Sequence, residues 1–453
     1  MNIKKIILLI VLSLMLQRLH AAEPIGKVSF VRGSVAAILA NKESRLLGKD
    51  TPIYQGDNIQ TSARSFVIII FNDGTKITVR PDSSFSINEY SNQQTKQSVK
   101  MELHKGGIRA NSGEISKDDP TKFQIKTPLT TVNAKQADYS VRLCTNDCEE
   151  ESKRLKNKKP TKANLVVARV AKIKGNVTAE NSKPPAKQRR LVVGSPLYSG
   201  DQLSSQKNSS AVIAFRDGER ITVEAKTEYV IKQYQYQQEN QEDKVIHKLI
   251  VGGMRVLTGK IGKVKKENYK INTPVATIGI RGTGFDLYYI DEEGLYSYVW
   301  QGTIDQTNEA GDNILTILKS SYIANEHSIM KTLPKLPTKL LQNLPLRPDK
   351  ISINQEKLFK TNSLKGVPAG LYVTVHDGYV RLGSSELDLG KNETGYVNDN
   401  KKIIRLELQL FQEEDPYPLP SNFDPLNAKI GKYSLLVDKY TSSSASTYEC
   451  VAE

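Results

Sequence analysis

The chain repeats itself, and this repeat constrains the fold more than any other feature. The segment from 52 to 87, PIYQGDNIQTSARSFVIIIFNDGTKITVRPDSSFSI, aligns without a gap on the segment from 196 to 231, PLYSGDQLSSQKNSSAVIAFRDGERITVEAKTEYVI. The offset between them is a constant 144 residues. Downstream the match continues at an offset of 146, where the Gly-Gly-x-Arg and Thr-Pro motifs at 106 and 127 recur at 252 and 273. The sequence therefore contains two copies of one domain.

Each copy has the residue pattern of β-structure. Runs of β-branched and aromatic residues end at an Asp-Gly pair, which readily adopts the positive φ angles of a tight hairpin. The predicted hairpin turns are therefore Asp73 with Gly74 and Asp217 with Gly218. Neither copy contains a helical periodicity of useful length. We predict an all-β protein with tandem duplicated domains of the β-roll, solenoid or sandwich type, followed by a C-terminal β module.

The first residues indicate export. Lys4 and Lys5 precede an apolar run from 6 to 16, and small residues follow at 21 and 22, which is the order of a secretory signal peptide. A run of about 11 apolar residues is too short to cross a bilayer, which needs roughly 20. We expect residues 1–22 to be cleaved, leaving a periplasmic protein of a Gram-negative envelope that has no transmembrane span.

The formal charge is +15 at pH 7, and loss of Lys4, Lys5 and Arg18 lowers it by three, to +12. For an exported chain, this charge favours anionic envelope polymers or acidic protein surfaces as partners over nucleic acid.

The three cysteines also fit an exported protein. Cys144 and Cys148 lie in the polar stretch CTNDC, close enough to pair across a short loop. Cys450 is left as an odd thiol near the end of the chain. Two cysteines without a nearby histidine do not form a zinc site, so a local disulfide is the expected state of the pair.

Composition divides the rest of the chain. A charged stretch separates the two copies, and leucines interleaved with prolines follow the second copy, as expected of an extended arm packed on the body or of a partner-binding segment. Around Gly370 the sequence echoes the stretch from Gly294 to Gly302 at an offset of 76. The predicted parts are the signal peptide 1–22, a first domain 24–148, a linker 149–165, a second domain 166–305, a connector 306–366 and a C-terminal module 367–453.

The stretch INTPVATIGIRGTGFDLYY, residues 271–289, requires a decision between a phosphate-binding loop and a corner between strands. Its glycines do not follow the G-x-G-x-x-G order, and no predicted helix follows them, so the helix N-terminus that would bind phosphate is missing. We predict a bent connection between two strands, in which the candidate interaction or structural motif is Arg281, Gly282, Thr283 and Phe285. For Arg281 we expect an ion pair with a carboxylate of the same copy, such as Asp217 or Asp201.

These motifs together resemble the FecR domain family. The resemblance rests on the order G-x-V, G-D, F-x-D-G-x-x-I-T-V, G-G-x-R and T-P-V-A-T-I-G-I-R-G-T-G-F, over residues 25–142 and again over 166–303. The first copy departs from it, because Lys135-Gln136-Ala137 stands where the second copy has Arg281-Gly282-Thr283. The resemblance implies a periplasmic sensor that relays a signal rather than an enzyme. The cytoplasmic segment and membrane span of such relays are not evident in this sequence.

Nothing in the sequence indicates catalysis or a cofactor. Neither H-E-x-x-H nor G-x-S-x-G occurs. Two hypotheses from different classes remain. The first is a non-catalytic protein-interaction or signal-sensing module that binds a receptor or another periplasmic protein. The second is a structural or glycan-binding envelope protein that holds peptidoglycan or another anionic polymer.

Overall fold

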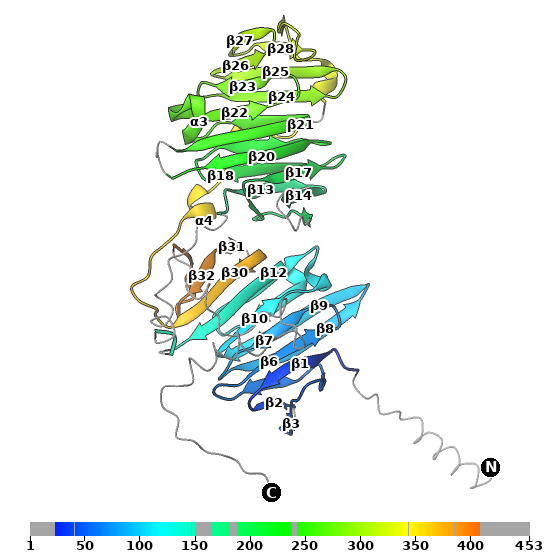
Figure 1. The fold of residues 1–453 in the computed structure, drawn as a ribbon, viewed down its shortest axis with the longest axis vertical. Helices are drawn as coiled ribbons and strands as arrows, with labels where there is room; N and C mark the ends of the chain where they lie inside the picture. The colour runs from blue at the N-terminus through cyan, green and yellow to red at the C-terminus, as the bar shows by residue number, and fades with distance from the viewer. Residues whose placement is uncertain are drawn as a thin grey trace, which may run out of the picture. The chain divides into compact units, whose positions relative to one another are not determined.

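The computed structural model describes residues 23–407, except 40, 146, 150–164, 182–187, 238–241, 343 and 385. Within this range the chain is almost entirely β-strand, so the all-β prediction is confirmed (Figure 1). The predicted signal peptide, nearly all of the linker, Cys450 and the chain after 407 lie outside the described residues. Contacts divide the described residues into two compact units, one with residues 23–115 and 122–128, the other with 116–121 and 129–407.

The first unit contains most of the first copy. Its strands form two series, β4-β1-β6-β7-β10 and β3-β2-β5-β8-β9-β11, in which neighbouring strands run antiparallel except for the parallel pair β9 and β11. The inward positions are filled by side chains such as Val28, Ile69 and Phe85, each with no exposed surface. The bounds are β1 Gly26–Arg32, β2 Val35–Ile38, β3 Ser44–Leu46, β4 Pro52–Ile53, β5 Asn58–Thr61, β6 Phe66–Phe71, β7 Lys76–Val79, β8 Ser84–Gln93, β9 Lys96–Lys105, β10 Gly107–Asn111 and β11 Phe123–Lys126.

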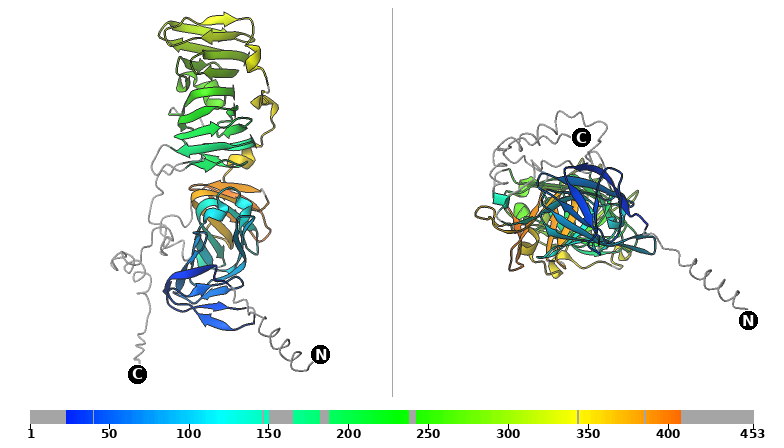
Figure 2. Two further views of the ribbon diagram at one scale, coloured as in Figure 1. Left: turned by 90° about the vertical axis from the view of Figure 1, so that its right-hand side faces the viewer. Right: turned by 90° about the horizontal axis from the view of Figure 1, so that it is seen from below.

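The second copy repeats this topology in the second unit and extends it. One sheet runs β16-β13-β18-β19-β21-β24-β25-β28-β29 and the other β15-β14-β17-β20-β21-β22-β23-β26-β27, so that the long strand β21 belongs to both. The strands are stacked one after another (Figure 2). Their bounds are β13 Ala168–Lys174, β14 Val177–Asn181, β15 Arg189–Arg190, β16 Pro196–Leu197, β17 Asp201–Ser205, β18 Ser210–Phe215, β19 Arg220–Val223, β20 Glu228–Gln235, β21 Lys244–Leu257, β22 Tyr269–Asn272, β23 Thr277–Ile280, β24 Gly284–Ile290, β25 Gly294–Gln301, β26 Thr303–Asn308, β27 Gly311–Thr316, β28 Ser320–Ile323 and β29 Lys331–Leu333.

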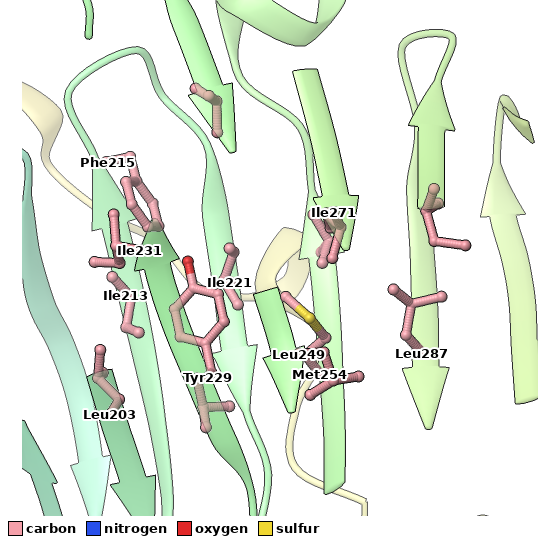
Figure 3. Close-up of a cluster of buried hydrophobic side chains, with 14 of the residues drawn as sticks. Leu203, Ile213, Phe215, Ile221, Tyr229, Ile231, Leu249, Met254, Ile271 and Leu287 are labelled. Carbon is pink, nitrogen blue, oxygen red and sulfur yellow. The ribbon is translucent and has the colours of Figure 1, made fainter. Parts of the chain in front are cut away.

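One apolar core joins the two sheets of the second copy. Side chains from both sheets, including Leu203, Ile213, Phe215 and Leu287, belong to a single buried cluster (Figure 3). In β20 and β22 they alternate with exposed or half-buried residues, because successive side chains of a strand point to opposite faces, whereas β18 and β24 are buried on both faces.

The few helices described are short. The bounds are α3 Lys260–Val264, α4 Gln355–Phe359, η1 Glu114–Ser116, η2 Pro120–Lys122, η3 Lys266–Asn268, η4 Thr338–Leu340 and η5 Pro348–Lys350.

The two Asp-Gly turns have the same geometry. Gly74 and Gly218 adopt φ angles of +82° and +89°. The carboxylate of Asp73 accepts a bond from Tyr90, as that of Asp217 does from Tyr234, over 3.2 and 3.0 Å. Each turn is thus tied to the strand that begins ten or more residues later.

Ordered β-structure continues beyond the predicted end of the second domain. Strands β27, β28 and β29 lie in residues 311–333, inside the stretch predicted to be a connector. They are short and largely polar, with alternation too weak to predict a strand. Beyond them, the proline-rich arm packs on the second copy, where Arg220 donates to the carbonyl of Ile351 over 2.8 Å and Arg255 to that of Pro345 over 2.7 Å.

The C-terminal strands, β30 Gly370–Leu382, β31 Leu387–Gly390, β32 Thr394–Val397 and β33 Ile403–Leu406, pair with β12 Thr131–Cys144. By the offset of 146 residues, β12 corresponds to β23 and β24 of the second copy. Cys144 lies opposite Gly370 as Ile290 lies opposite Gly294, and the same correspondence holds along the strand to Val132 opposite Leu382. The C-terminal strands therefore correspond to β25–β29, and the second copy stands in the sequence between two parts of the first.

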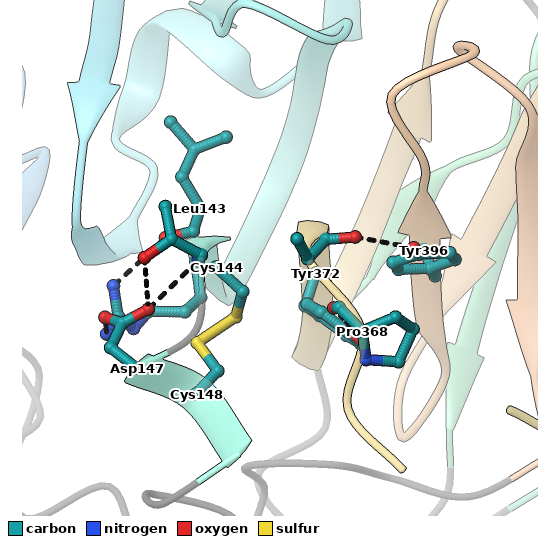
Figure 4. The surroundings of a disulfide bond; sticks show 10 residues. Leu143, Cys144, Asp147, Cys148, Pro368, Tyr372 and Tyr396 are labelled. Carbon is teal, nitrogen blue, oxygen red and sulfur yellow. Dashed lines mark hydrogen bonds and ion pairs between the residues drawn. A yellow bond between two sulfur atoms is a disulfide. The ribbon is translucent and has the colours of Figure 1, made fainter. Parts of the chain in front are cut away.

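The predicted cysteine pair lies at the end of β12. Cys144 and Cys148 form a disulfide with their Cα atoms 5.5 Å apart. Their side chains belong to a small buried cluster with Tyr372 and Tyr396 of the C-terminal strands, whose hydroxyl groups donate to the carbonyls of Pro368 and Ala369 (Figure 4). The disulfide thus fixes the chain end of β12 beside the strands that pair with it.

Candidate interaction surface

The motif of the opening stretch forms the corner between β23 and β24. Gly282 adopts a φ of +69°, and Gly302, between β25 and β26, approaches so closely that a Cβ there would lie 2.7 Å from the Gly282 carbonyl oxygen. Thr283 and Phe285 have no exposed surface. The backbone N–H of Thr283 donates to Thr258 Oγ1 over 3.0 Å. The corner is therefore built from the motif's backbone and buried side chains.

The side chain of Trp300 packs against this corner beneath the proline-rich arm. A Cβ on Gly284 would lie 2.1 Å from the indole ring. The indole Nε1 donates to Asp286 over 3.0 Å, and Arg255 donates to the same carboxylate through Nε and Nη2. Only glycine fits at position 284, because the bond from Trp300 to the Asp286–Arg255 pair holds the indole ring in this place.

Arg281 is the exposed member of the motif. Its side chain is 54% exposed, and its Nε lies 3.2 Å from Asp305 Oδ2. The expected partners were wrong: the carboxylate of Asp217 accepts bonds inside its own hairpin, and that of Asp201 pairs with Arg189. Strand register explains the difference, because Gly279 lies opposite Asp305 and thereby places Arg281 beside this carboxylate. Such an exposed pair contributes little to stability and leaves Arg281 able to reach another partner.

The first copy retains the shape of the corner without its sequence. Gln136 takes the place of Gly282 with a φ of +44°, and Gly378 takes the place of Gly302 with a φ of +80°. Lys135, in the place of Arg281, is only 4% exposed, and its ammonium donates to the carbonyl of Arg190 over 2.7 Å. Burial lowers the pKa of Lys135 to about 8. The two corners therefore differ in whether another part of the chain covers them.

The sequence model of one family, described as FecR protein, matches residues 57–153 and 201–305. These are the two repeats, and the matched segments include both corners. Both segments are FecR domains. No curated protein matches the chain.

Two crystal structures of a Parabacteroides distasonis protein described as an anti-sigma factor, at 1.65 and 2.50 Å resolution, are similar to part of the chain. Each has 14% identity and a TM-score of 0.24, over 29% of this chain and 58% of theirs.

One end of the first FecR domain is occupied by the second domain. Arg381 Nη2 donates to the carbonyl of Val193 over 2.6 Å, and the backbone N–H of Lys391 donates to the Tyr198 hydroxyl over 2.7 Å. Pro196 packs against Gly390, where a Cβ would lie 2.6 Å from the proline ring. We call this contact, between residues 379–393 and residues 189–198, the junction.

A buried ionic cluster holds the junction together. Arg169 has no exposed surface and donates to Glu393 and, over 3.1 Å, to the carbonyl of Gly194. Arg405 and Arg216 lie 3.3 and 3.8 Å from the same carboxylate. The neighbouring arginines hold the pKa of Glu393 below its usual range although burial opposes them. Removing one member of such a cluster would leave an uncompensated buried charge, so the junction depends on all of its members.

The corresponding end of the second FecR domain has no such cover among the described residues. Arg281 and Asp305 are the counterparts of Lys135 and Arg381. Asp305 lies opposite Ile314 on β27 as Arg381 lies opposite Asp388 on β31, so Ile314, Ile317 and Leu318 correspond to Asp388, Lys391 and Asn392. The exposed fractions of these three apolar residues are 57, 52 and 67%. We call Arg281, Asp305, Ile314 and residues 316–319 the free end of the second domain.

Two buried polar groups were missed in the sequence. His247 has no exposed surface and lies 2.7 Å from the Tyr229 hydroxyl through Nδ1 and 3.0 Å from Glu219 through Nε2. Tyr269 donates to the other oxygen of Glu219. His247 falls between Val245 and Leu249 at inward positions of β21, and this alternation was the available signal.

The other buried group lies under the proline-rich arm. Glu224 accepts from Tyr288 over 3.3 Å, and burial raises its pKa to about 7, with Asp286 adding to the rise and Arg255 opposing it. Arg347 of the arm lies 4.5 Å above the Trp300 ring. Beside Glu224, Arg255 pairs with Asp286 and donates to the carbonyl of Pro345 in the arm. Because these polar side chains have partners within the domain, the buried group has a structural role.

The residues described include no group of three or more His, Cys, Asp or Glu that could hold a metal ion. Among the same residues, no helix has the length and apolar character needed to cross a membrane.

Proposed function

We propose that this chain is an exported, non-catalytic FecR protein of the bacterial envelope that senses or relays a signal by binding another protein. The proposal places it in the periplasm after cleavage of residues 1–22. The match to the FecR family supports a regulatory role. The architecture of the two domains indicates which surface would bind the partner.

The observation that carries the proposal is the contrast between the two domain ends. In the first FecR domain, the end strands bind a protein surface at the junction. In the second FecR domain, the same end exposes three large apolar side chains, Ile314, Ile317 and Leu318, on and beside the edge strand β27. Exposed apolar side chains on an edge strand mark a binding site for another chain, because the strand also offers unpaired backbone groups.

The chemistry of the buried groups favours binding over catalysis. Within the described part of the chain, Glu219, Glu224 and His247 all lie inside the domain with partners of their own. A substrate would have to displace packed strands or the arm to reach them. The free end instead exposes an ion pair and apolar side chains, which suit a protein partner.

The test is cross-linking of the tagged mature protein in living cells, followed by washing at low and at 1 M salt. Charge-driven polymer binding would be lost at high salt, because screening shortens to roughly 3 Å. We expect a defined protein adduct that survives the wash and is lost in the I314S/I317S/L318S variant. The matched control is V264S, which removes an apolar side chain of 66% exposure from α3. Recovery of peptidoglycan alone, and only at low salt, would support the polymer-binding alternative and refute the proposal.

A further inference from the structure

The junction shows what kind of surface fits the end of a FecR domain. Residues 189–198 of the second domain correspond to 45–54 of the first at the offset of 144. The two segments have the same internal bonds: Arg45 pairs with Asp57 as Arg189 pairs with Asp201, and Leu47 N–H donates to Val35 as Leu191 N–H donates to Val177. The first domain therefore carries a second example of the surface that the junction binds.

This second example is not covered by any of the residues that the structure describes. Pro196 is buried in the junction, whereas its counterpart Pro52 is exposed. Leu46 is 77% exposed, and the side chains of Lys27 and Asp50 are each 63% exposed in a surface ion pair. We call Leu46, Lys49, Asp50 and Pro52 the open edge of the first domain. Among the described residues, each chain thus has an uncovered domain end, the free end, and an uncovered surface of the kind that binds a domain end in the junction, the open edge.

We propose that the free end of the second FecR domain binds the open edge of the first FecR domain of another copy of this chain. This inference rests on the proposed function, because it names the partner of the same surface. The contact is heterologous, since two different patches meet. A linear assembly therefore has an unoccupied free end at one terminus and an unoccupied open edge at the other. Repetition of such a contact produces an open chain of molecules unless it closes into a ring.

Two corresponding positions bring groups of opposite polarity together in the proposed contact. Lys135 donates to the Arg190 carbonyl in the junction, and its counterpart Arg281 would face the carbonyl of the exposed Leu46. Arg381 reaches the carbonyl of Val193, and its counterpart Asp305 would face Lys49. The Arg169–Glu393 pair is not reproduced, because its counterparts Lys27 and Lys319 are both cationic; Lys27 is paired with Asp50. The apolar side chains Ile314, Ile317 and Leu318 supply the rest of the contact.

At one position the proposed contact needs more space between the two surfaces than the junction has. Asp388 lies against Gly194, where a Cβ would be 2.1 Å from its carboxylate. In the proposed contact, Ile314 would meet Asp50, which has a side chain at this place. The two patches must therefore sit farther apart around this pair than in the junction. We expect a weaker, reversible contact for this reason, which suits regulated assembly.

The experiment uses the purified mature protein in sedimentation velocity over a concentration series. We expect reversible association of the wild type, and at least tenfold weaker association of D305K and of K49D, because each variant brings like charges together. An equimolar mixture of D305K and K49D restores association, since each end then meets an edge of opposite charge. The control is K270D, a charge reversal at an exposed position of β22 away from both patches, which leaves association unchanged.

A wild-type protein that stays monomeric to 100 µM would overturn the inference, as would single variants that associate like the wild type or a mixture that fails to restore association. The proposed function has a separate outcome. If the purified chain is monomeric while the free end still forms a salt-resistant adduct with a different protein in cells, the binding role stands and only the self-association is refuted.

Discussion

Replacing the buried His247 network tests how the second FecR domain tolerates charge in its core. The four polar residues Glu219, Tyr229, His247 and Tyr269 have apolar or small counterparts in the first domain. At offsets of 144 and 146, these counterparts are Thr75, Phe85, Met101 and Phe123, each at most 1% exposed. The chain thus supplies a packed, uncharged version of the same core.

The single change H247M removes the partner 3.0 Å from Glu219 and leaves a fully buried carboxylate with Tyr269 alone. Removing one partner of a buried hydrogen-bonded carboxylate costs about 1–3 kcal/mol, and about 3–5 kcal/mol where that partner is charged. The fourfold variant E219T/Y229F/H247M/Y269F removes every polar member together, and such exchanges are neutral or stabilising by up to about 4 kcal/mol. We therefore expect the single variant to unfold at much lower urea concentration than the fourfold variant.

The assay is urea unfolding followed by tryptophan fluorescence. The sequence has one tryptophan, and Trp300 lies on β25 of the second domain, so the signal reports on this domain. The reasoning is refuted if the fourfold variant is destabilised as much as H247M, because the network would then stabilise the domain beyond what apolar packing supplies. It is also refuted if H247M costs less than about 1 kcal/mol.

Three further predictions concern other parts of the second unit. Because burial raises the pKa of Glu224 from 4.5 to about 7, the stability that its protonated form contributes is complete below pH 4.5 and is lost as the pH rises through 7. In urea unfolding, the free energy of unfolding of E224Q should exceed that of the wild type by up to about 3 kcal/mol at pH 8 and match it at pH 4. A larger advantage at pH 4 than at pH 8 would contradict this. G284A forces a Cβ against Trp300 and should cost more than about 2 kcal/mol with a changed emission maximum, whereas G282A, with nothing within 4 Å, should cost about 1 kcal/mol and leave the emission unchanged. The double change C144S/C148S opens a short covalent loop and should cost about 2 kcal/mol at most in thermal unfolding, so a loss of the folded state at 25 °C would show that the bond does more than restrict the unfolded chain.

Much of the architecture could be predicted because the signals that carry it can be read along the chain. The alternating runs and the Asp-Gly pairs involve neighbouring residues, and their recurrence at a constant offset of 144 shows two copies; together they predicted two all-β FecR domains. The corner at 281–285 was predicted from glycines and aromatic residues that are adjacent in the sequence, and β23 ends at Ile280 while β24 begins at Gly284. The echo at Gly370 also pointed to strands like those that follow the corner in the second domain.

Contacts over long separations could not be predicted in the same way. The pairing of β12 with β30 joins residues more than 220 positions apart, and no local pattern shows that strands from the end of the chain complete the pairing of β12. The partner of Arg281 depends on the register of two strands, in which a shift of one residue would move Asp305 to the other face. The free end was not foreseen because Ile317 and Leu318, read alone, look like core residues.

The most direct test of the account is site-specific photo-cross-linking in living cells from position 314 at the free end. A photoreactive residue at position 264 on α3 serves as control, because Val264 is comparably apolar and exposed but lies away from this end. The account predicts a discrete protein adduct from position 314 and none of the same size from position 264. Equal adducts from both positions, or none from either, would contradict the claim that the free end of the second FecR domain is a protein-binding surface.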